Sequence, residues 1–261
     1  MRTFDDFSLS TQVLKQFYTK KISISPSSEN LRDILNEHHK LVVALNHGPI
    51  LAPGVVNVAI ADIFLKNGGS NRTPMGIIWK HFYKVPGIKK VVAYITQVKE
   101  AYNLDEFVEQ FISHDYNDLM VMPEGENCCF GDGIEIQPYL SPRFVEIAIK
   151  ADTPILIGVH HGTHVLASPL EISSRYNRWF KKIMPDNSYK RLKDTQLVSL
   201  PKFTGGKVNI ECSFKLYQPT LTLEQLADNK EERMQQLWKE SDIIRQHMQT
   251  MMDNIQAAQQ P

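Results

Sequence analysis

Residues 41–49 read Leu-Val-Val-Ala-Leu-Asn-His-Gly-Pro, a short apolar run that ends in a polar turn. Such a run, rich in apolar and β-branched residues, is typical of a strand that is buried on both faces. The apolar residues that resume after Pro49 predict a helix over residues 54–66, which Gly68 and Gly69 would end. A strand, a turn and a helix in this order indicate an α/β fold.

The same alternation continues along the chain. Further strands are predicted at residues 76–79, 91–95, 119–122, 154–159 and 208–214, and further helices at residues 104–114, 142–150 and 222–258. Residues 1–39 predict two short helices with a break at Pro26. We therefore expect one α/β domain with a single mixed, largely parallel sheet flanked by helices, made of a helical N-terminal extension (1–39), a core (40–220) and a C-terminal helix (221–261).

Composition limits the possible functions. The chain of 261 residues is long enough for one large domain, and its 29 Lys and Arg balance 29 Asp and Glu, so no overall positive field favours nucleic acid. The three cysteines make a poor disulfide framework, which indicates reduced thiols in the cytoplasm. The first 21 residues do not resemble a secretory signal, and the most apolar stretch, residues 41–65, holds too many polar residues to span a bilayer. We expect a cytoplasmic protein that reaches lipid, if at all, at the inner membrane surface.

Asn46, His47 and Gly48 follow the first predicted strand of the core. In open α/β sheets, ligands bind at the carboxyl ends of the strands, and a histidine there can take a proton from a hydroxyl near neutral pH. The plain alternative is a histidine that only caps a turn. Pro123, Glu124 and Gly125 follow another predicted strand and would lie at the same edge of the sheet, although an ordinary turn explains them equally well.

These two blocks are followed by Arg143–Ala148 and Pro154–Ile157. The succession resembles the phospholipid/glycerol acyltransferase superfamily over roughly residues 41–165, and residues 141–159 are most similar to its neutral-lipid branch. That family carries a His-x4-Asp block after a strand and a Pro-Glu-Gly-Thr-Arg block near the middle. The resemblance implies that His47 is the catalytic base. It also implies that substrate contacts come from Asn46, Gly48, Pro123, Glu124 and Gly125.

The sequence departs from the family at the partner of the base. Five residues after His47, where the family has Asp or Glu, stands Ala52. A methyl group cannot orient an imidazole, so the His-x4-Asp motif is degenerate here. A carboxylate from another loop (Glu124, Glu126 or Asp132) or a backbone carbonyl would have to replace it.

A second departure follows the Pro-Glu-Gly block. Glu126 and Asn127 stand where the family has Thr and Arg, and the family's Arg is associated with the phosphate of the acceptor. A carboxylate repels phosphate, so this sequence favours an acceptor without phosphate at that place.

The resemblance implies an acyltransferase. His47 would remove a proton from an acceptor hydroxyl, and the oxygen would attack the thioester of an acyl-CoA or acyl-carrier protein directly. No Gly-x-Ser-x-Gly elbow is present, and no further cofactor is implied. Two other hypotheses stay open: a catalytically silent relative that binds lipid or acyl chains, favoured by Ala52, and an acyl-ester or thioester hydrolase in which His47 activates water.

Two further clusters carry alternatives. His160, His161 and His164 have the spacing of metal ligands, but no local carboxylate or cysteine completes a set, so we expect no metal and favour residues that line a pocket or lie at the surface. Cations alternate with aromatic residues between Arg175 and Lys182, which suits either a solvated amphipathic helix or contact with lipid headgroups. The residues expected at a membrane are Arg175, Arg178, Trp179, Lys181 and Lys182.

Overall fold

The computed structural model describes residues 1–78, 80–100, 102–202 and 206–259, with the backbone alone at residues 80, 81, 177 and 178. Within these ranges six strands form one sheet in the order β1-β8-β5-β2-β4-β3, and four of its five strand pairs are parallel, β5 with β8 being antiparallel. The strands are β1 (Thr19–Ile24), β2 (Leu41–Leu45), β3 (Pro74–Gly76), β4 (Asp118–Val121), β5 (Ile155–His161) and β8 (Val208–Tyr217). The predicted α/β class with a mixed, largely parallel sheet is confirmed.

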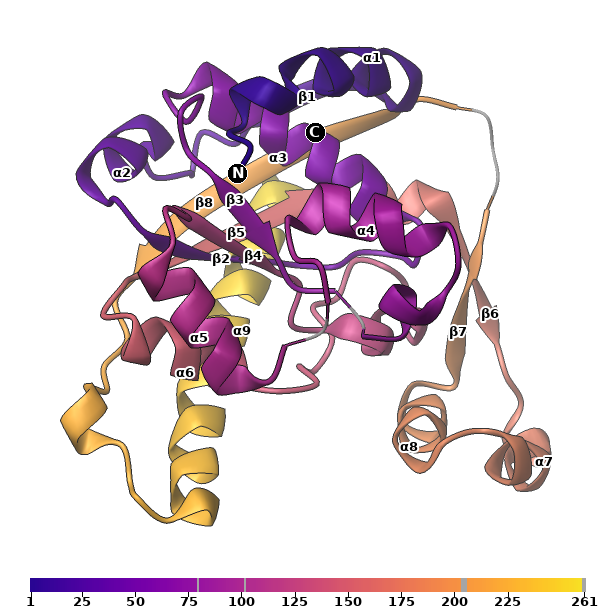
Figure 1. The fold of residues 1–261 in the computed structure, drawn as a ribbon. Coiled ribbons are helices and arrows are strands. Elements are labelled where there is room, and N and C mark those ends of the chain that lie inside the picture. The colour runs from indigo at the N-terminus through magenta and orange to yellow at the C-terminus, as the bar shows by residue number, and fades with distance from the viewer. Residues whose placement is uncertain (79, 101, 203–205, 260–261) are drawn as a thin grey trace.

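Helices cover both faces of this sheet (Figure 1). One face carries α1 (Ser8–Tyr18), α2 (Leu31–Glu37) and α3 (Ala52–Lys66). The other carries α5 (Leu104–Ser113), α6 (Arg143–Lys150) and the long C-terminal helix α9 (Lys230–Gln259). The helix α4 (Ile88–Thr96) lies beside β3 at the edge of the sheet.

Strand β2 shows why its sequence is uniformly apolar. Leu41, Val43 and Leu45 point into the hydrophobic cluster under α2 and α3, whereas Val42 and Ala44 point into the cluster under α5, α6 and α9. All five side chains are at most 1% exposed. A central strand between two helical layers has no solvent face, so every position is apolar.

The N-terminal extension differs from its prediction. The two expected helices are present as α1 and α2, but Thr19–Ile24 lies between them as β1 and pairs in parallel with β8. The main sheet therefore begins well before residue 40, and the predicted start of the core there is wrong. The strand was missed because only one of its six residues, Thr19, is buried, so no run or alternation of apolar residues marks it.

A second correction concerns residues 91–95, which were predicted as a strand and form part of the helix α4. Val92 and Thr96, four residues apart, face inward, while Val91 and Ile95 are exposed. The spacing of the buried positions thus follows a helix despite the β-branched composition. The strand predicted at 76–79 is β3, which ends at Gly76, and Trp79 lies outside the described residues.

Residues 167–202 form an arm that projects from the body at the lower right of Figure 1. The strands β6 (Ala167–Glu171) and β7 (Leu197–Pro201) pair as an antiparallel ribbon, and the helices α7 (Asn177–Ile183) and α8 (Asp186–Thr195) lie between them in sequence. Nothing in the sequence analysis predicted this hairpin. Within the described ranges every helix is too short or too polar to cross a lipid bilayer.

Candidate active site

The two predicted motifs meet at the carboxyl edge of the sheet. His47 follows β2 and Glu124 follows β4, and these strands are parallel neighbours in register. The backbone N–H of His47 donates a hydrogen bond of 2.6 Å to Oε1 of Glu124. The predicted convergence of the two loops is therefore present in the structure.

Glu124 is held inside the protein by backbone donors on both sides. Its second carboxyl oxygen, Oε2, accepts the N–H of Gln137 at 2.6 Å, and its side chain is almost fully buried. Burial raises the pKa of Glu124 to about 7, although the N–H groups of His47 and Gln137 and the positive charge of Arg245 favour the ionised form. Glu124 thus fastens two loops together, and its predicted contact with substrate stays a prediction.

The ring of His47 is arranged as a neutral base. Its Nδ1 lies 3.1 Å from the carbonyl oxygen of Gly48. A carbonyl only accepts, so in the neutral ring the proton is on Nδ1 and the lone pair is on Nε2. Burial lowers the pKa of His47 below its ordinary value, which keeps the ring unprotonated at neutral pH.

A backbone carbonyl therefore occupies the place of the missing acidic partner. Among the described residues, no carboxylate forms a hydrogen bond with the His47 ring. Of the carboxylates considered from the sequence, Asp132 accepts N–H groups of its own loop and Glu126 is exposed beside Ser188. Ala52 is fully buried at the start of α3. The Gly48 carbonyl can fix the tautomer, but it supplies no negative charge to stabilise the imidazolium.

Asn46 and His160 form a clasp that the sequence analysis missed. The Asn46 side chain bonds both backbone groups of His160, donating to its carbonyl at 3.1 Å and accepting its N–H at 2.8 Å. In return, Nε2 of His160 lies 3.0 Å from the Asn46 carbonyl, and Nδ1 lies 3.3 Å from the Thr163 hydroxyl. Burial lowers the pKa of His160 to about 3, so the neutral ring donates from Nε2 and accepts at Nδ1.

This clasp fixes the end of β2 to the end of β5, directly before His47. The Asn46 side chain makes these two hydrogen bonds within the protein, and its predicted contact with substrate stays a prediction. The signal available in the sequence was a histidine after a predicted strand. We expected it to line a pocket or lie at the surface, and its contact with Asn46 was not foreseen. The described residues hold no group of three or more His, Cys, Asp or Glu side chains placed to bind a metal ion.

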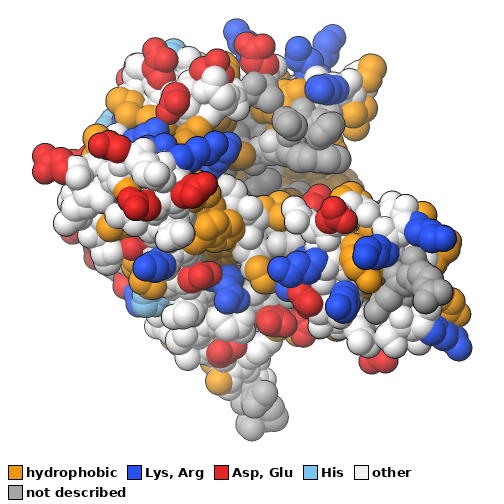
Figure 2. All heavy atoms as spheres, turned by 90° about the horizontal axis from the view of Figure 1, so that it is seen from below, with side chains coloured by type: hydrophobic (Ala, Val, Ile, Leu, Met, Phe, Trp, Pro, Cys, Tyr) orange, Lys and Arg blue, Asp and Glu red, His pale blue; other side chains and the backbone are white. Residues whose placement is uncertain are grey.

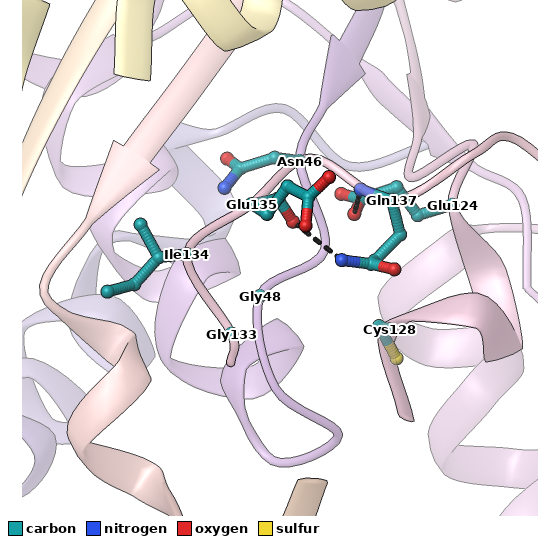
Figure 3. Close-up of a pocket in the computed structure, with 8 residues that line it drawn as sticks. All are labelled: Asn46, Gly48, Glu124, Cys128, Gly133, Ile134, Glu135 and Gln137. Carbon is teal, nitrogen blue, oxygen red and sulfur yellow. Dashed lines mark hydrogen bonds between the residues drawn. The ribbon is translucent and has the colours of Figure 1, made fainter. Parts of the chain in front are cut away.

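A small pocket opens beside these groups (Figure 3). The residues that line it are Asn46, Gly48, Glu124, Cys128, Gly133, Ile134, Glu135 and Gln137. Two of these positions require glycine. Gly48 has φ +63°, and a side chain there would meet Thr163 and His160, while Gly133 has φ +80° and packs against Pro49. The pocket loop, residues 131–137, is thus pressed against the turn that carries His47.

Cys128 is the polar neighbour of the base on the pocket side. Its Sγ lies 3.9 Å from Nε2 of His47, and its side chain is buried. The neighbouring Cys129 thiol, burial and the nearby carboxylates all raise the pKa of Cys128. A buried thiol of raised pKa is a poor nucleophile, so the structure gives no sign that Cys128 supplies an attacking group.

Comparisons with known proteins add little to this geometry. No family model and no curated protein matches the sequence. A solved structure that is similar is the 1-acyl-sn-glycerophosphate acyltransferase of Thermotoga maritima, at 14% identity and a TM-score of 0.43, with 94% of this chain and 77% of that chain covered. Neither the family nor the activity follows from a likeness of that extent.

Proposed function

We propose that this protein is an acyltransferase that moves a fatty acyl group from a thioester donor, acyl-CoA or acyl-carrier protein, to a hydroxyl of a lipid-like acceptor. The observation that carries the proposal is the neutral His47 ring, with Nδ1 on the Gly48 carbonyl and Nε2 directed away from it. A proton acceptor of this kind, at the carboxyl end of a parallel strand, suits the activation of a hydroxyl. The succession of motifs from His47 to the Pro-Glu-Gly block supports acyl transfer as the reaction.

In the proposed reaction, Nε2 of His47 takes the proton of the acceptor hydroxyl as its oxygen attacks the thioester carbonyl carbon. The tetrahedral intermediate collapses and the carbon–sulfur bond breaks. The leaving thiolate takes the proton from His47. The ester and a free thiol are the products, and the ring returns to its neutral state. Such general-base assistance is worth about 10²–10⁴-fold in rate.

The acceptor is expected to lack a phosphate beside the Pro-Glu-Gly turn. Glu126 is exposed there and places a negative charge at the surface. Asn127 is buried, and its side-chain amide donates to the carbonyl of Pro138 at 2.7 Å, so it is not free to bind an anion. A neutral hydroxyl therefore fits this position better than a phosphorylated one.

Two other functions compete with this proposal. No carboxylate among the described residues bonds the His47 ring, and Ala52 stands at the usual position, which favours a catalytically silent relative that binds lipid or acyl chains. Because Nε2 would accept a proton from water as well as from an alcohol, hydrolysis of the acyl ester or thioester is the third candidate.

One experiment separates the three. Radiolabelled long-chain acyl-CoA and acyl-carrier protein are incubated with total membrane lipid and either the wild type, His47→Ala or His161→Ala. His161 lies at the end of β5, on the same edge of the sheet, and its ring stacks on His164 at 4.9 Å between centroids. We expect label in one lipid class with wild type and His161→Ala, and its loss with His47→Ala. Release of free fatty acid would identify a hydrolase, and no turnover with retained lipid binding would identify the silent protein.

A further inference from the structure

The arm, residues 167–202, carries a net positive charge, although the formal net charge of the whole chain is zero. It carries eight Lys or Arg against three Asp or Glu, whereas the whole chain holds 29 of each. Arg175, Lys181, Lys182, Lys190 and Lys193 are all exposed on it. The Arg178 side chain, also expected at a membrane, lies outside the described residues. Figure 2 shows the lobe at the right with Lys and Arg side chains gathered on its surface and hydrophobic ones between them.

Large apolar side chains are exposed next to these cations. Trp179 and Ile183 lie one turn apart on α7 and are 57% and 58% exposed. On the ribbon, the pairing of Ser168 with Leu200 and of Leu170 with Val198 places Leu170 and Leu200 on one face, and both are exposed. The arm therefore presents apolar side chains that the described part of the chain leaves exposed, interleaved with cations.

The helix α8 of the arm is tied to the pocket loop. Nη2 of Arg191, on α8, donates to Oε1 of Gln137 at 2.7 Å, and the backbone N–H of Gln137 donates to Glu124. Glu124 in turn accepts the backbone N–H of His47. Leu192, beside Arg191, is 1% exposed, and α8 contacts the turn Gly125–Cys129. A path of hydrogen bonds through Gln137 and Glu124 thus connects the arm to His47.

We propose that the arm docks the protein on an anionic lipid surface, and that Arg191 holds the docked arm against the pocket loop so that the site faces that surface. The proposal rests on the proposed function, since an acceptor held in a membrane can reach His47 only if the site is brought to the lipid surface. Trp179 and Ile183 would enter the headgroup level, and the flanking lysines would meet the lipid charges.

The pairing of charge with exposed apolar groups is what points to lipid. Nucleic acid or an acidic protein surface would satisfy the cations, but neither explains a tryptophan and an isoleucine exposed on the same helix face together with two leucines on the ribbon. A bilayer surface takes both kinds of side chain at once: anionic headgroups attract Lys and Arg, and the underlying acyl boundary takes the apolar ones.

The docking test measures binding to vesicles without any reaction. Vesicles of phosphatidylglycerol and phosphatidylcholine are compared with vesicles of phosphatidylcholine alone, at low and high salt. Lys181→Glu/Lys182→Glu is matched with Lys89→Glu/Lys90→Glu, the same change of charge on two exposed lysines of α4. We expect wild type and the α4 variant to bind the anionic vesicles within about threefold of each other, and the arm variant to lose about a hundredfold. Equal loss in both variants, binding to neutral vesicles alone, or binding to duplex DNA in place of vesicles would overturn the proposal.

A spectroscopic signal checks which part of the arm enters the lipid. The chain has three tryptophans, and wild-type fluorescence should shift to the blue on addition of anionic vesicles. Trp179→Phe should abolish that shift while leaving most of the binding intact. A shift that persists in Trp179→Phe would place another part of the protein at the membrane and contradict the proposed docking face.

The role of Arg191 is tested by comparing two variants that each remove one cation from α8, Arg191→Met and Lys193→Met. Both should bind anionic vesicles equally. We expect acyl transfer to an acceptor in vesicles to fall about tenfold or more in Arg191→Met alone, with transfer to the same acceptor in detergent micelles unchanged in both. Gln137→Leu removes the other partner of the contact and should reproduce the same loss in vesicles.

If the rate of acyl transfer by Arg191→Met falls equally in vesicles and in micelles, the contact only stabilises the pocket loop. If the rate falls in neither, Arg191 does not hold the arm against the pocket loop. Absence of transfer by wild type in every presentation would refute the proposed function and leave the binding results to decide the docking.

Discussion

Polar groups are buried and hydrogen-bonded at the site, whereas on the arm they are exposed to solvent. At the carboxyl edge of the sheet, Glu124, Asn46 and His160 are buried, and nearly every donor and acceptor has a partner inside the protein. On the arm, cations and large apolar side chains stand side by side in solvent. The first arrangement fixes one geometry around His47, and the second leaves exposed the surface that we propose to dock on lipid. The buried contacts around His47 and the exposed surface of the arm thus belong to two parts of the protein, and the hydrogen bond from Arg191 to Gln137 links them.

The largest difference in stability is expected between two neighbouring glutamates. Glu124→Ala leaves the N–H groups of His47 and Gln137 without acceptors, and each unsatisfied buried group costs about 1–3 kcal/mol. The free energy of unfolding in urea should fall by about 2–6 kcal/mol. Glu126→Ala, at an exposed position two residues away, should change it by less than about 0.5 kcal/mol. Similar effects in the two variants would mean that Glu124 does not fasten the two loops.

The boundary between the body and the arm can be located with two leucines. Leu192 is 1% exposed and Leu200 is 44% exposed, although both belong to the arm. Leu192→Ala should lower the free energy of unfolding by about 2–4 kcal/mol, because it removes a buried side chain and opens a cavity. Leu200→Ala should be close to neutral in stability and should weaken only vesicle binding. A neutral Leu192→Ala would show that α8 is not held in place by the burial of this side chain.

A pH series tests the clasp on the site side. Burial lowers the pKa of His160 to about 3 in the folded protein, whereas the unfolded chain binds this proton below about 6.5. Its contribution to stability is therefore complete above pH 6.5 and is lost as the pH falls toward 3, by up to about 1.4 kcal/mol per unit. The raised pKa of Glu124 acts in the opposite direction, because its folded form takes up a proton below about pH 7.

The opposing slope of Glu124 cancels when wild type is compared with His160→Gln at each pH. We expect the stability advantage of wild type to shrink by about 2 kcal/mol between pH 6.5 and pH 4.5 in urea unfolding. A constant difference across this range would mean that His160 titrates normally and is not buried in the clasp. His161→Gln, on a half-buried neighbour, serves as the control and should show a weaker dependence.

The sequence predicted the parts of the molecule in which local pattern and tertiary position agree. Strand β2 is buried on both faces, so its apolar run could be recognised, and the loops after β2 and β4 followed from it. Residues 91–95 have a strand-like composition, but their place at the edge of the sheet selects a helix with one buried side. The arm depends on pairing Ala167–Glu171 with Leu197–Pro201, and no local pattern specifies partners so far apart in the chain.

The site divides in the same way. His47 and Glu124 could be placed because each follows a strand, and a parallel sheet brings such loops to one edge. The partner of the His47 ring could not be identified, since a backbone carbonyl leaves no mark in a sequence. The clasp between Asn46 and His160 depends on the register of β2 and β5, in which Leu45 pairs with Gly158. That register is a property of the folded sheet and not of either segment alone.

The smallest expected effect is that of Cys128→Ala. It tests whether the acyl group passes directly from donor to acceptor or through a covalent intermediate on the protein. Its thiol lies 3.9 Å from the base but is buried and has a raised pKa, so direct transfer to the acceptor does not require it. Cys128→Ala should retain acyl transfer within about threefold, as should Cys129→Ala, with no acyl group on the protein by intact mass measurement after incubation with donor alone. Loss of activity in Cys128→Ala only, together with a donor-dependent acyl adduct on wild type, would establish a thioester intermediate. His47 would then serve the thiol first and the acceptor second, and the missing carboxylate would matter less, because a thiol needs a weaker base than a hydroxyl does.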